Sequence, residues 1–339
     1  MVSLPRPLPC QHGEGVLFWS NMQSTIVGNV KSQRVVIASV SGGKDSTAMC
    51  LHFKEWGIPF TPIFLDTGWE NAVTYDYLRN HLPKIIGEIT WRRMEVELSD
   101  ELEAIALEFE ERMGHYSSMV RLCLKKAIFP SRTKRWCTEL LKAHVIRDYL
   151  KELDDEPVSA VGIRAEESEK RSKMTEWEWV DEYDCDIWRP LIGWSEQDVI
   201  DIHTRNGVRP NENYLLGTKR VGCWPCIYCA KKEIHHIADS DPERIDLLED
   251  LEAVVHQIAA ERLVERTGEG PRYPRAWFQN PAPVRDPETG KRPGDCWPIR
   301  KVVDWARTKY GGRQFELFLP PLRDRGCMRW GLCDTKIED

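Results

Sequence analysis

A pair of glycines between a strand-like and a helix-like segment constrains the fold of this chain more than any other feature. The apolar run 34–40 predicts a buried strand, and residues 47–56 have the character of a helix. Glycines at such a junction let the backbone turn sharply, and the following helix presents its positive end to an anion. The sequence therefore predicts a phosphate-binding loop, called the phosphate loop below. Its residues are Ser41, Gly42, Gly43, Lys44, Asp45 and Ser46.

Two side chains of the phosphate loop suggest the kind of ligand. Lys44 supplies a mobile cation, and Asp45 is a candidate ligand for Mg²⁺. The Walker loop of kinases and GTPases needs four residues between its first glycine and the Gly-Lys pair, a spacing that this segment lacks. The pattern therefore predicts binding of a nucleotide pyrophosphate outside the Walker class.

The segments after the phosphate loop predict a parallel sheet. Further strands are expected at 59–65, 89–98, 157–163 and, as a short strand, 188–192, with helices at 75–82, 100–113, 138–150 and 195–206. Such alternation of strands and helices predicts an α/β fold whose ligand binds at the carboxyl edge of the sheet. Asp66 and Arg164 follow two of these strands. We expect Asp66 to bind Mg²⁺ or a ribose, and Arg164 to neutralise phosphate charge.

The character of the chain changes near residue 239. One amphipathic helix is expected through residue 262, and residues 267–298 are rich in Gly and Pro and predict loops. The predicted organisation is an N-terminal extension at 1–33, a nucleotide-binding domain with the cysteine cluster at 34–238, and a mixed helix and loop extension at 239–339.

Three cysteines at three-residue intervals predict a metal centre. Cys223, Cys226 and Cys229 lie in a short segment that also contains Pro225, so one loop can wrap its thiolates around one centre. A [4Fe-4S] cluster and tetrahedral Zn²⁺ both accept four thiolates, and the spacing does not separate them. The fourth ligand must come from another part of the chain.

Composition limits the class of protein. The net charge of −7 argues against a surface that coats nucleic acid throughout, although the basic clusters at 125–126 and 132–135 leave a local binding face open. No segment has the roughly 20 consecutive apolar residues of a membrane span, and the first residues do not have a secretory pattern. A cytoplasmic protein is therefore expected, in which the 11 cysteines serve metal or redox chemistry.

The motifs together resemble the PP-loop ATP pyrophosphatase superfamily, in its phosphoadenosine phosphosulfate reductase-like branch, which includes subunits of DNA phosphorothioation type. The resemblance implies a Rossmann-like parallel sheet with helices on both faces, of the adenine nucleotide alpha hydrolase-like kind. It also implies nucleotide contacts by the phosphate loop, Asp66 and Arg164. The matching segments are 41–46, 66–68, 135–142, 162–168 and 222–223.

The same resemblance implies the fourth cluster ligand. Arg135, Cys137 and Lys142 follow the arginine, cysteine and lysine pattern of the reductase branch, so Cys137 is expected to complete the set, with Cys123 and Cys185 in reserve. A cysteine desulfurase as sulfur donor is implied only by the family.

Two departures from the reductase pattern matter. Reductases that carry the cluster have adjacent paired cysteines where this chain has Trp136 followed by Cys137. Their C-terminal Cys-Gly pair is also missing, since neither Cys327 nor Cys333 precedes a glycine. Either cysteine could still act as a nucleophile or persulfide carrier, or be an ordinary reduced thiol.

The leading hypothesis is ATP-dependent sulfur transfer through adenylation of an acceptor, with pyrophosphate release and an iron-sulfur cluster. One alternative is a reductase that releases sulfite from phosphoadenosine phosphosulfate or adenylyl sulfate. Another is a non-catalytic, nucleotide-sensing iron-sulfur subunit of a nucleic-acid modification complex. The residues do not distinguish DNA, tRNA, a small metabolite or a carrier protein as acceptor, and they leave the oligomeric state open.

Overall fold

The computed structural model describes residues 34–153, 156–216, 218–271, 274–281 and 295–308, together with Trp330. The predicted N-terminal extension, Cys327 and Cys333 lie outside the described residues.

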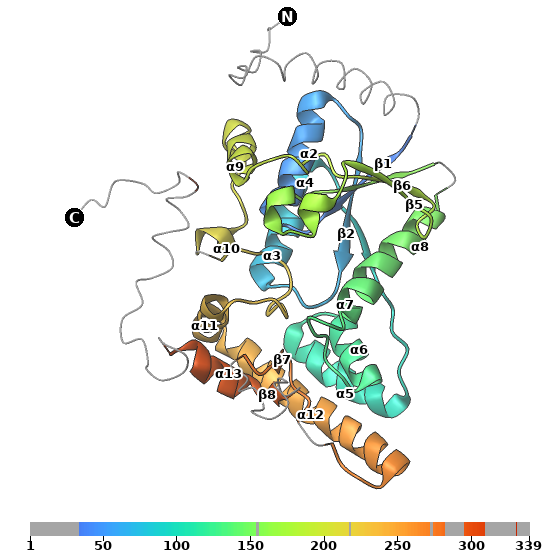
Figure 1. The fold of residues 1–339 in the computed structure, drawn as a ribbon, viewed down its shortest axis with the longest axis vertical. Helices are drawn as coiled ribbons and strands as arrows, with labels where there is room; N and C mark the ends of the chain where they lie inside the picture. Colours follow the sequence, from blue (N-terminus) through green and yellow to red (C-terminus); the bar gives the residue numbers. More distant parts are fainter. Residues whose placement is uncertain are drawn as a thin grey trace, which may run out of the picture.

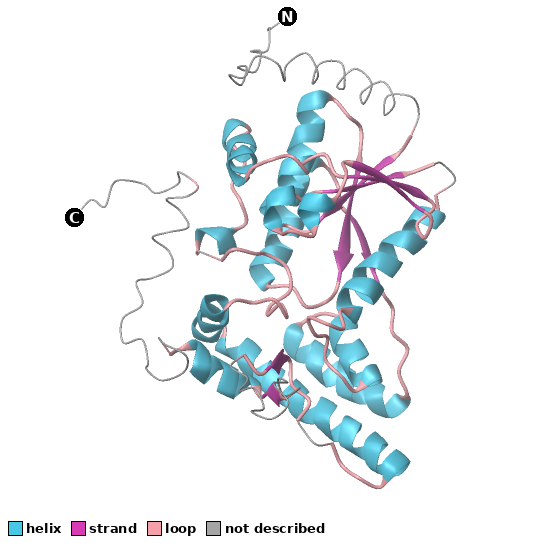
Figure 2. Cartoon of the chain, in the orientation of Figure 1, coloured by secondary structure: helices cyan, strands magenta, loops and turns pink. Residues whose placement is uncertain are grey.

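A six-stranded sheet forms the centre of the α/β part, in the order β3-β2-β1-β4-β6-β5. Strands β3, β2, β1, β4 and β6 are parallel, and β5 pairs with β6 in the antiparallel sense. Figures 1 and 2 show helices around this sheet. The strands are β1 (Val36–Val40), β2 (Thr61–Asp66), β3 (Thr90–Arg93), β4 (Val158–Val161), β5 (Trp177–Val180) and β6 (Cys185–Trp188).

The alternation of side chains along the strands places helices on both faces. On one face, Val36 and Ala38 pack with residues of the helix that follows the phosphate loop, including Phe53. On the other face, Ile37 and Ile63 pack with a later helix. The predicted Rossmann-like architecture is therefore confirmed.

The helices differ widely in length, and the longest is α12, with 26 residues. The α-helices are α2 (Lys44–Trp56), α3 (Ala72–Asp76), α4 (Pro83–Ile86), α5 (Asp100–Met113), α6 (Ser118–Lys126), α7 (Trp136–Thr138), α8 (Val145–Lys151), α9 (Glu196–Arg205), α10 (Glu212–Leu215), α11 (Lys231–Ser240), α12 (Pro242–Thr267) and α13 (Ile299–Ala306). The wider π-helical turns are η1 (Tyr77–His81) and η2 (Glu139–His144), and the 3₁₀ turns are η3 (Ala165–Glu167) and η4 (Arg171–Lys173).

A second apolar cluster joins helices from distant parts of the sequence. Residues of α5 and α6 share it with residues of α11, α12 and α13, and Trp69 and Trp224 lie in the same cluster. In Figure 1 these five helices gather at the end of the molecule below the sheet. A small antiparallel pair, β7 (Phe278–Gln279) and β8 (Cys296–Trp297), adjoins them. The C-terminal region is helical, and the boundary at residue 238 stays a prediction.

Several local expectations differ from the structure. The strand expected at 89–98 is β3, which covers only Thr90–Arg93. The short strand expected at 188–192 is the end of β6, which stops at Trp188, because a turn follows in which Ile192 N donates to Arg189 O at 3.0 Å. Pro83 does not end the helical path, since its missing N–H is tolerated at the first position of α4. The β5–β6 hairpin and α6 were not predicted.

None of the helices in the described ranges combines the length and the apolar character that crossing a membrane requires.

Candidate functional site

The phosphate loop has the conformation that its glycines predict. Gly42 has a φ of +69°, and the side-chain hydroxyl of Ser46 closes the loop. It accepts from Ser41 N at 3.2 Å and donates to Gly43 O at 3.1 Å. Helix α2 begins at Lys44, three residues earlier than expected, so its first turn lies inside the motif. In that turn Thr47 N donates to Gly43 O and Lys44 N to the Tyr214 hydroxyl. The N–H groups of Asp45 and Ser46 lie between them, at the helix N-terminus where an anion binds.

Gly162 holds the first turn of α2 against β4. A Cβ atom at this position would lie 2.8 Å from Asp45 O and 2.9 Å from Ser46 Cα. Both neighbours belong to the backbone and have little freedom to move. The glycine after β4 is therefore required by close packing against the phosphate loop.

Asp45 joins the two cations expected from the sequence. Its Oδ1 accepts from Arg164 Nε at 2.5 Å, and its Oδ2 lies 3.2 Å from Lys44 Nζ. Arg164 is only 3% exposed and also pairs with Glu166. Burial lowers the pKa of Arg164, but the hydrogen bond from its guanidinium to Asp45 more than compensates, so the pKa is raised overall. Both Asp45 oxygens thus have a cationic partner, and each keeps a second lone pair that a Mg²⁺ ion would use.

Two residues beside the loop were not predicted. Tyr214 lies 170 residues after Lys44 in the sequence, yet its hydroxyl accepts from Lys44 N at 3.2 Å. Glu196 Oε1 lies 3.5 Å from Lys44 Nζ. The sequence contains only indirect signals for them, since Glu196 lies in the predicted first turn of a helix and Tyr214 stands outside any recognised motif.

Trp330 brings the end of the chain to the same region. Its ring centroid lies 5.3 Å from that of His203 and 6.1 Å from that of Tyr214. The side chain is 6% exposed. Trp330 lies three residues from both Cys327 and Cys333 in the sequence.

Asp66 lies at the end of β2 and takes part in a hydrogen-bonded turn. Its Oδ1 accepts from Gly68 N at 2.8 Å and from the Tyr75 hydroxyl at 2.7 Å. The same hydroxyl lies 3.1 Å from Glu70 Oε2. Burial raises the pKa of Glu70. Asp66 is thus oriented by its turn and linked through Tyr75 to a second carboxyl group.

The cysteine loop, residues 223–229, is attached to the segment after β2. Cys223 and Glu70 form an antiparallel bridge, and Trp224 N donates to Trp69 O at 2.8 Å. Cys226 N donates to Cys229 Sγ at 3.2 Å. The cysteine loop therefore lies beside the turn that carries Asp66, at the carboxyl edge of the sheet.

Cys137 lies near the cysteine loop, although the thiols do not form a closed metal site. The charge of Cys226 raises the pKa of Cys137 and of Cys223, and the Lys142 ammonium lowers both. These effects indicate that the thiols lie close to one another and to Lys142. Burial raises the pKa of Cys223 to about 12, with Lys142 opposing it in part. Across the residues that the structure describes, no three His, Cys, Asp or Glu side chains are grouped closely enough to hold one metal ion. The donor chemistry fits a thiolate centre, but the side-chain positions do not.

The two reserve cysteines differ in their surroundings. Cys123 is fully buried, and burial raises the pKa of its thiol. The neighbouring Cys137 raises that pKa further. Cys185 lies on β6 in the cluster with Ile37 and Ile63, on the sheet face packed against α8.

Three arginines surround the aromatic ring within the cysteine loop. The guanidinium carbons of Arg132, Arg135 and Arg220 lie 5.7, 6.0 and 5.8 Å from the ring centroid of Tyr228. All three side chains are exposed, and over the described ranges none of them forms an ion pair with a carboxylate. The cysteine loop therefore has an uncompensated basic surface.

The chain is similar in sequence to a protein family and to three individual proteins. A family model described as the phosphoadenosine phosphosulfate reductase domain matches residues 35–229. An uncharacterized 37.8 kDa protein of Escherichia phage 186 is 30% identical, over 83% of this chain and 90% of the phage protein. Two uncharacterized proteins of Methanocaldococcus jannaschii are 27% identical to it, and the matches cover 44% of each.

Two solved structures are similar at low sequence identity. A phosphoadenylyl-sulfate reductase from Candida auris, in a phosphate complex, is 19% identical with a TM-score of 0.43, over 63% of this chain and 97% of that chain. An FMN adenylyltransferase from Candida glabrata, in complex with ATP, is 13% identical with a TM-score of 0.38, over 60% of this chain and 59% of that chain.

Proposed function

Because this chain belongs to the phosphoadenosine phosphosulfate reductase domain family, we propose that it binds Mg²⁺-ATP at the phosphate loop and transfers sulfur to an acceptor through adenylation. An acceptor oxygen attacks the α-phosphate, and pyrophosphate leaves. A sulfur nucleophile then attacks the adenylated acceptor and displaces AMP together with the acceptor oxygen. Where the donor is the persulfide of a cysteine desulfurase, a thiol reductant then cleaves the S–S bond that joins the donor to the acceptor. Adenylation makes that oxygen a good leaving group, so the chain is proposed to be a sulfurtransferase-like PP-loop enzyme.

The residues of the phosphate loop suit the first half of this reaction. Backbone N–H groups at the start of α2 would bind phosphate oxygens, while Lys44 and Arg164 would offset the charge on the departing pyrophosphate. The Asp45 carboxylate holds both cations beside the loop before the nucleotide arrives. The observation that carries the proposal is this convergence of Lys44, Asp45 and Arg164 on the glycine turn.

Nucleotide preference tests the proposal. By calorimetry on anaerobically purified protein, we expect Mg²⁺-ATP to bind at least tenfold more tightly than adenylyl sulfate or its 3′-phosphorylated form. The phosphate loop is proposed to act on a triphosphate, whose β- and γ-phosphates and Mg²⁺ it would contact, whereas a sulfonucleotide ends in a single sulfate. Preference for a sulfonucleotide would contradict ATP-dependent transfer, and ATP binding without turnover in the presence of acceptors and partners would favour the nucleotide-sensing alternative.

The contact between Trp330 and Tyr214 supports the reductase as an alternative function. Trp330 packs against Tyr214, whose hydroxyl accepts from Lys44 N. Trp330, which stands between Cys327 and Cys333 in the sequence, therefore lies against a residue that contacts the phosphate loop. If the chain is a reductase, sulfite release from a sulfonucleotide will depend on one of these cysteines and disappear in the matching Cys→Ser variant.

We further propose that Cys137, Cys223, Cys226 and Cys229 bind a [4Fe-4S] cluster, with Zn²⁺ as the alternative. Such a cluster would hold or deliver sulfur near the sheet edge. Binding requires the thiols to lose their protons and to move closer together, and the adenylation step described above does not depend on it.

Metal content tests this ligand set. Anaerobically purified protein is expected to contain about four iron and four sulfide per chain, whereas a zinc site would contain about one Zn²⁺. Cys226→Ser and Cys137→Ser should each lose most of the metal, because a tetrahedral thiolate site tolerates the loss of a ligand poorly. Cys185→Ser is the control. Retention of the metal by Cys137→Ser and its loss in Cys123→Ser or Cys185→Ser would show that the fourth ligand is misassigned.

The basic surface around Tyr228 supports a nucleic acid as acceptor. Arg132, Arg135 and Arg220 supply cations without carboxylate partners, and the Tyr228 ring between them could stack on a base. The triple variant with each arginine changed to Gln is expected to bind a single-stranded oligonucleotide at least tenfold more weakly. The slope of the logarithm of the binding constant against the logarithm of the salt concentration should also become shallower by about two, because each lost phosphate contact removes about 0.7.

The control for this experiment removes the same charge elsewhere. Lys173, Arg205 and Arg300 each pair with a carboxylate. Changing all three to Gln should leave oligonucleotide affinity within about threefold of the wild type, because only the net charge is altered. Equal losses in the two triple variants would indicate a general charge effect and would contradict a binding surface at the cysteine loop.

A further inference from the structure

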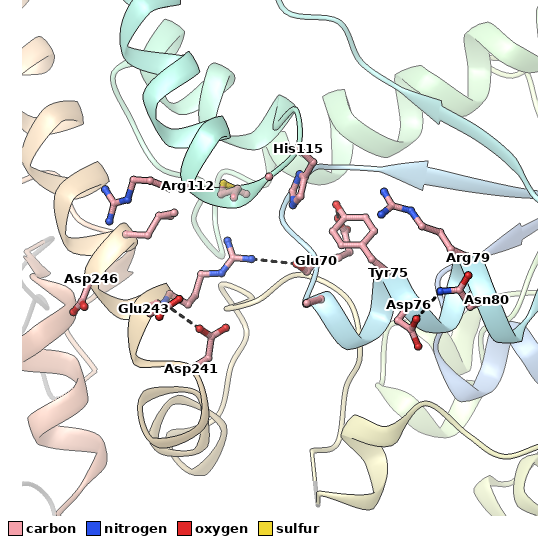
Figure 3. Close-up of a pocket in the computed structure, with 15 residues that line it drawn as sticks. Glu70, Tyr75, Asp76, Arg79, Asn80, Arg112, His115, Asp241, Glu243 and Asp246 are labelled. Carbon is pink, nitrogen blue, oxygen red and sulfur yellow. Dashed lines mark hydrogen bonds between the residues drawn. The ribbon is translucent and has the colours of Figure 1, made fainter.

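A cavity lies beside the turn that follows β2, and the phosphate loop does not line it. Its volume is about 700 Å³, within the range typical of small-molecule sites. Three segments line it, namely residues 70–80, residues 112–115 at the end of α5, and residues 241–247 at the start of α12. In Figure 3, Tyr75 and Arg79 face Asp241, Glu243 and Asp246 across the opening. The α12 side lies beyond the segment that matches the family model.

Arg244 on the α12 side has an unused hydrogen-bond donor. Its Nη2 donates to Glu70 O at 3.1 Å, and its guanidinium carbon lies 4.5 Å from the Trp69 ring centroid. Its Nη1 is buried and has no hydrogen-bond partner. A buried donor without an acceptor destabilises the free protein, and an oxygen from a ligand would remove that penalty.

Arg79 on the opposite side is also without an anion. Its guanidinium carbon lies 5.1 Å from the ring centroid of Tyr75 and 5.2 Å from that of Trp91. In the described ranges neither Arg79 nor Arg244 forms an ion pair with a carboxylate. Two guanidinium groups from different segments therefore line one cavity.

Most of the carboxylates around the cavity already have partners. Glu70 accepts from Thr67 and Tyr75, and Asp241 accepts from Arg244 N and from the Trp224 indole. The remaining partners are Asn80 and His81 for Asp76 and Arg300 for Asp246, while Glu243 is exposed. All of these carboxylates except Glu243 thus have a hydrogen-bond or ion-pair partner, whereas the guanidinium groups of Arg79 and Arg244 have no carboxylate partner among the described residues.

We propose that this cavity binds a small organic anion, whose carboxylate or phosphate group is held between Arg244 and Arg79. The planar guanidinium group matches the two oxygens of such an anion. The Tyr75 ring, with His115 at 5.0 Å from it, provides an aromatic surface for the rest of the molecule. Burial lowers the pKa of Arg244, and the negative charge of Asp241 opposes this shift in part.

The position of α3 places this second site next to the nucleotide. Thr74 on α3 faces the phosphate loop, since its Cγ2 lies 3.2 Å from the Cβ position of Gly42. Its neighbour Tyr75 lines the cavity. The two sites thus adjoin neighbouring faces of one short helix. The anion site does not depend on sulfur transfer being the reaction.

Anion binding in a Lys44→Ala background tests the site, because that background weakens anion binding at the phosphate loop. Inorganic phosphate and malonate, titrated by calorimetry, are expected to bind at one site with a Kd on the order of 1 mM or tighter. Adding Arg244→Met should weaken binding at least tenfold, and adding Arg79→Met about threefold or more. Arg79 is exposed, so the second variant tests the site without disturbing the core.

Arg112→Met is the matched control, because Arg112 lines the same cavity but is paired with Asp250 at 2.8 Å. The affinity of the Lys44→Ala, Arg112→Met double variant for phosphate and malonate should stay within about twofold of that of Lys44→Ala. The proposal is overturned if neither anion binds, or if Arg79→Met and Arg244→Met leave the affinity unchanged. Neither result depends on pyrophosphate release, so a failure of the proposed function is recognised separately.

Discussion

Gly162→Ala is expected to lower the free energy of unfolding by about 2 kcal/mol and to weaken Mg²⁺-ATP binding at least tenfold. The added methyl group would overlap the backbone of Asp45 and Ser46, with its carbon 2.8 Å from Asp45 O. A flexible side chain could move aside, whereas the first turn of α2 can do so only by leaving the position that the phosphate loop needs. Chemical denaturation and calorimetry with Mg²⁺-ATP measure the two effects.

Gly193→Ala is the control for that substitution. Gly193 has no atom within 4 Å of its Cβ position and no positive φ, so alanine should fit there without cost. The stability of this variant should stay within about 0.5 kcal/mol of the wild type. If Gly162→Ala behaves like Gly193→Ala, the contact between β4 and the phosphate loop is looser than the structure indicates.

Lys44→Ala is expected to reduce pyrophosphate release from Mg²⁺-ATP by about 10²–10³-fold. The ammonium group lies beside Asp45 and Glu196 in the free protein, at 3.2 and 3.5 Å. On nucleotide binding it would turn toward the phosphates and stabilise the charge that forms as pyrophosphate leaves. An assay of pyrophosphate with the acceptor present measures the effect.

Lys54→Ala provides the comparison within the same helix. Lys54 is exposed near the other end of α2 and donates to Ile85 O, so its loss removes a lysine without touching the phosphate loop. Pyrophosphate release should stay within about twofold of the wild type. Undiminished release by Lys44→Ala would rule out a catalytic role for the lysine of the phosphate loop.

Elements that depend on neighbouring residues were predictable. Helix α5 spans residues 100–113 as expected, because acidic residues occupy its first turn and Gly114 ends it in the left-handed conformation. The Ser195 side chain accepts from Asp198 N and caps α9, as its position before an acidic segment indicates. The β5–β6 hairpin was not predicted, because buried and exposed residues do not alternate along its two strands.

The amino-acid sequence alone determined the strand, glycine turn and helix of the phosphate loop, the parallel sheet around it, and the family of the chain. These features follow from backbone preferences and from motifs within a few residues. Only the tertiary structure decided that Tyr214 and Glu196 lie beside Lys44, and that α12 brings Arg244 to a cavity beside Tyr75. Such contacts join segments far apart in the chain, and they exist because distant apolar faces pack together, which no local pattern encodes.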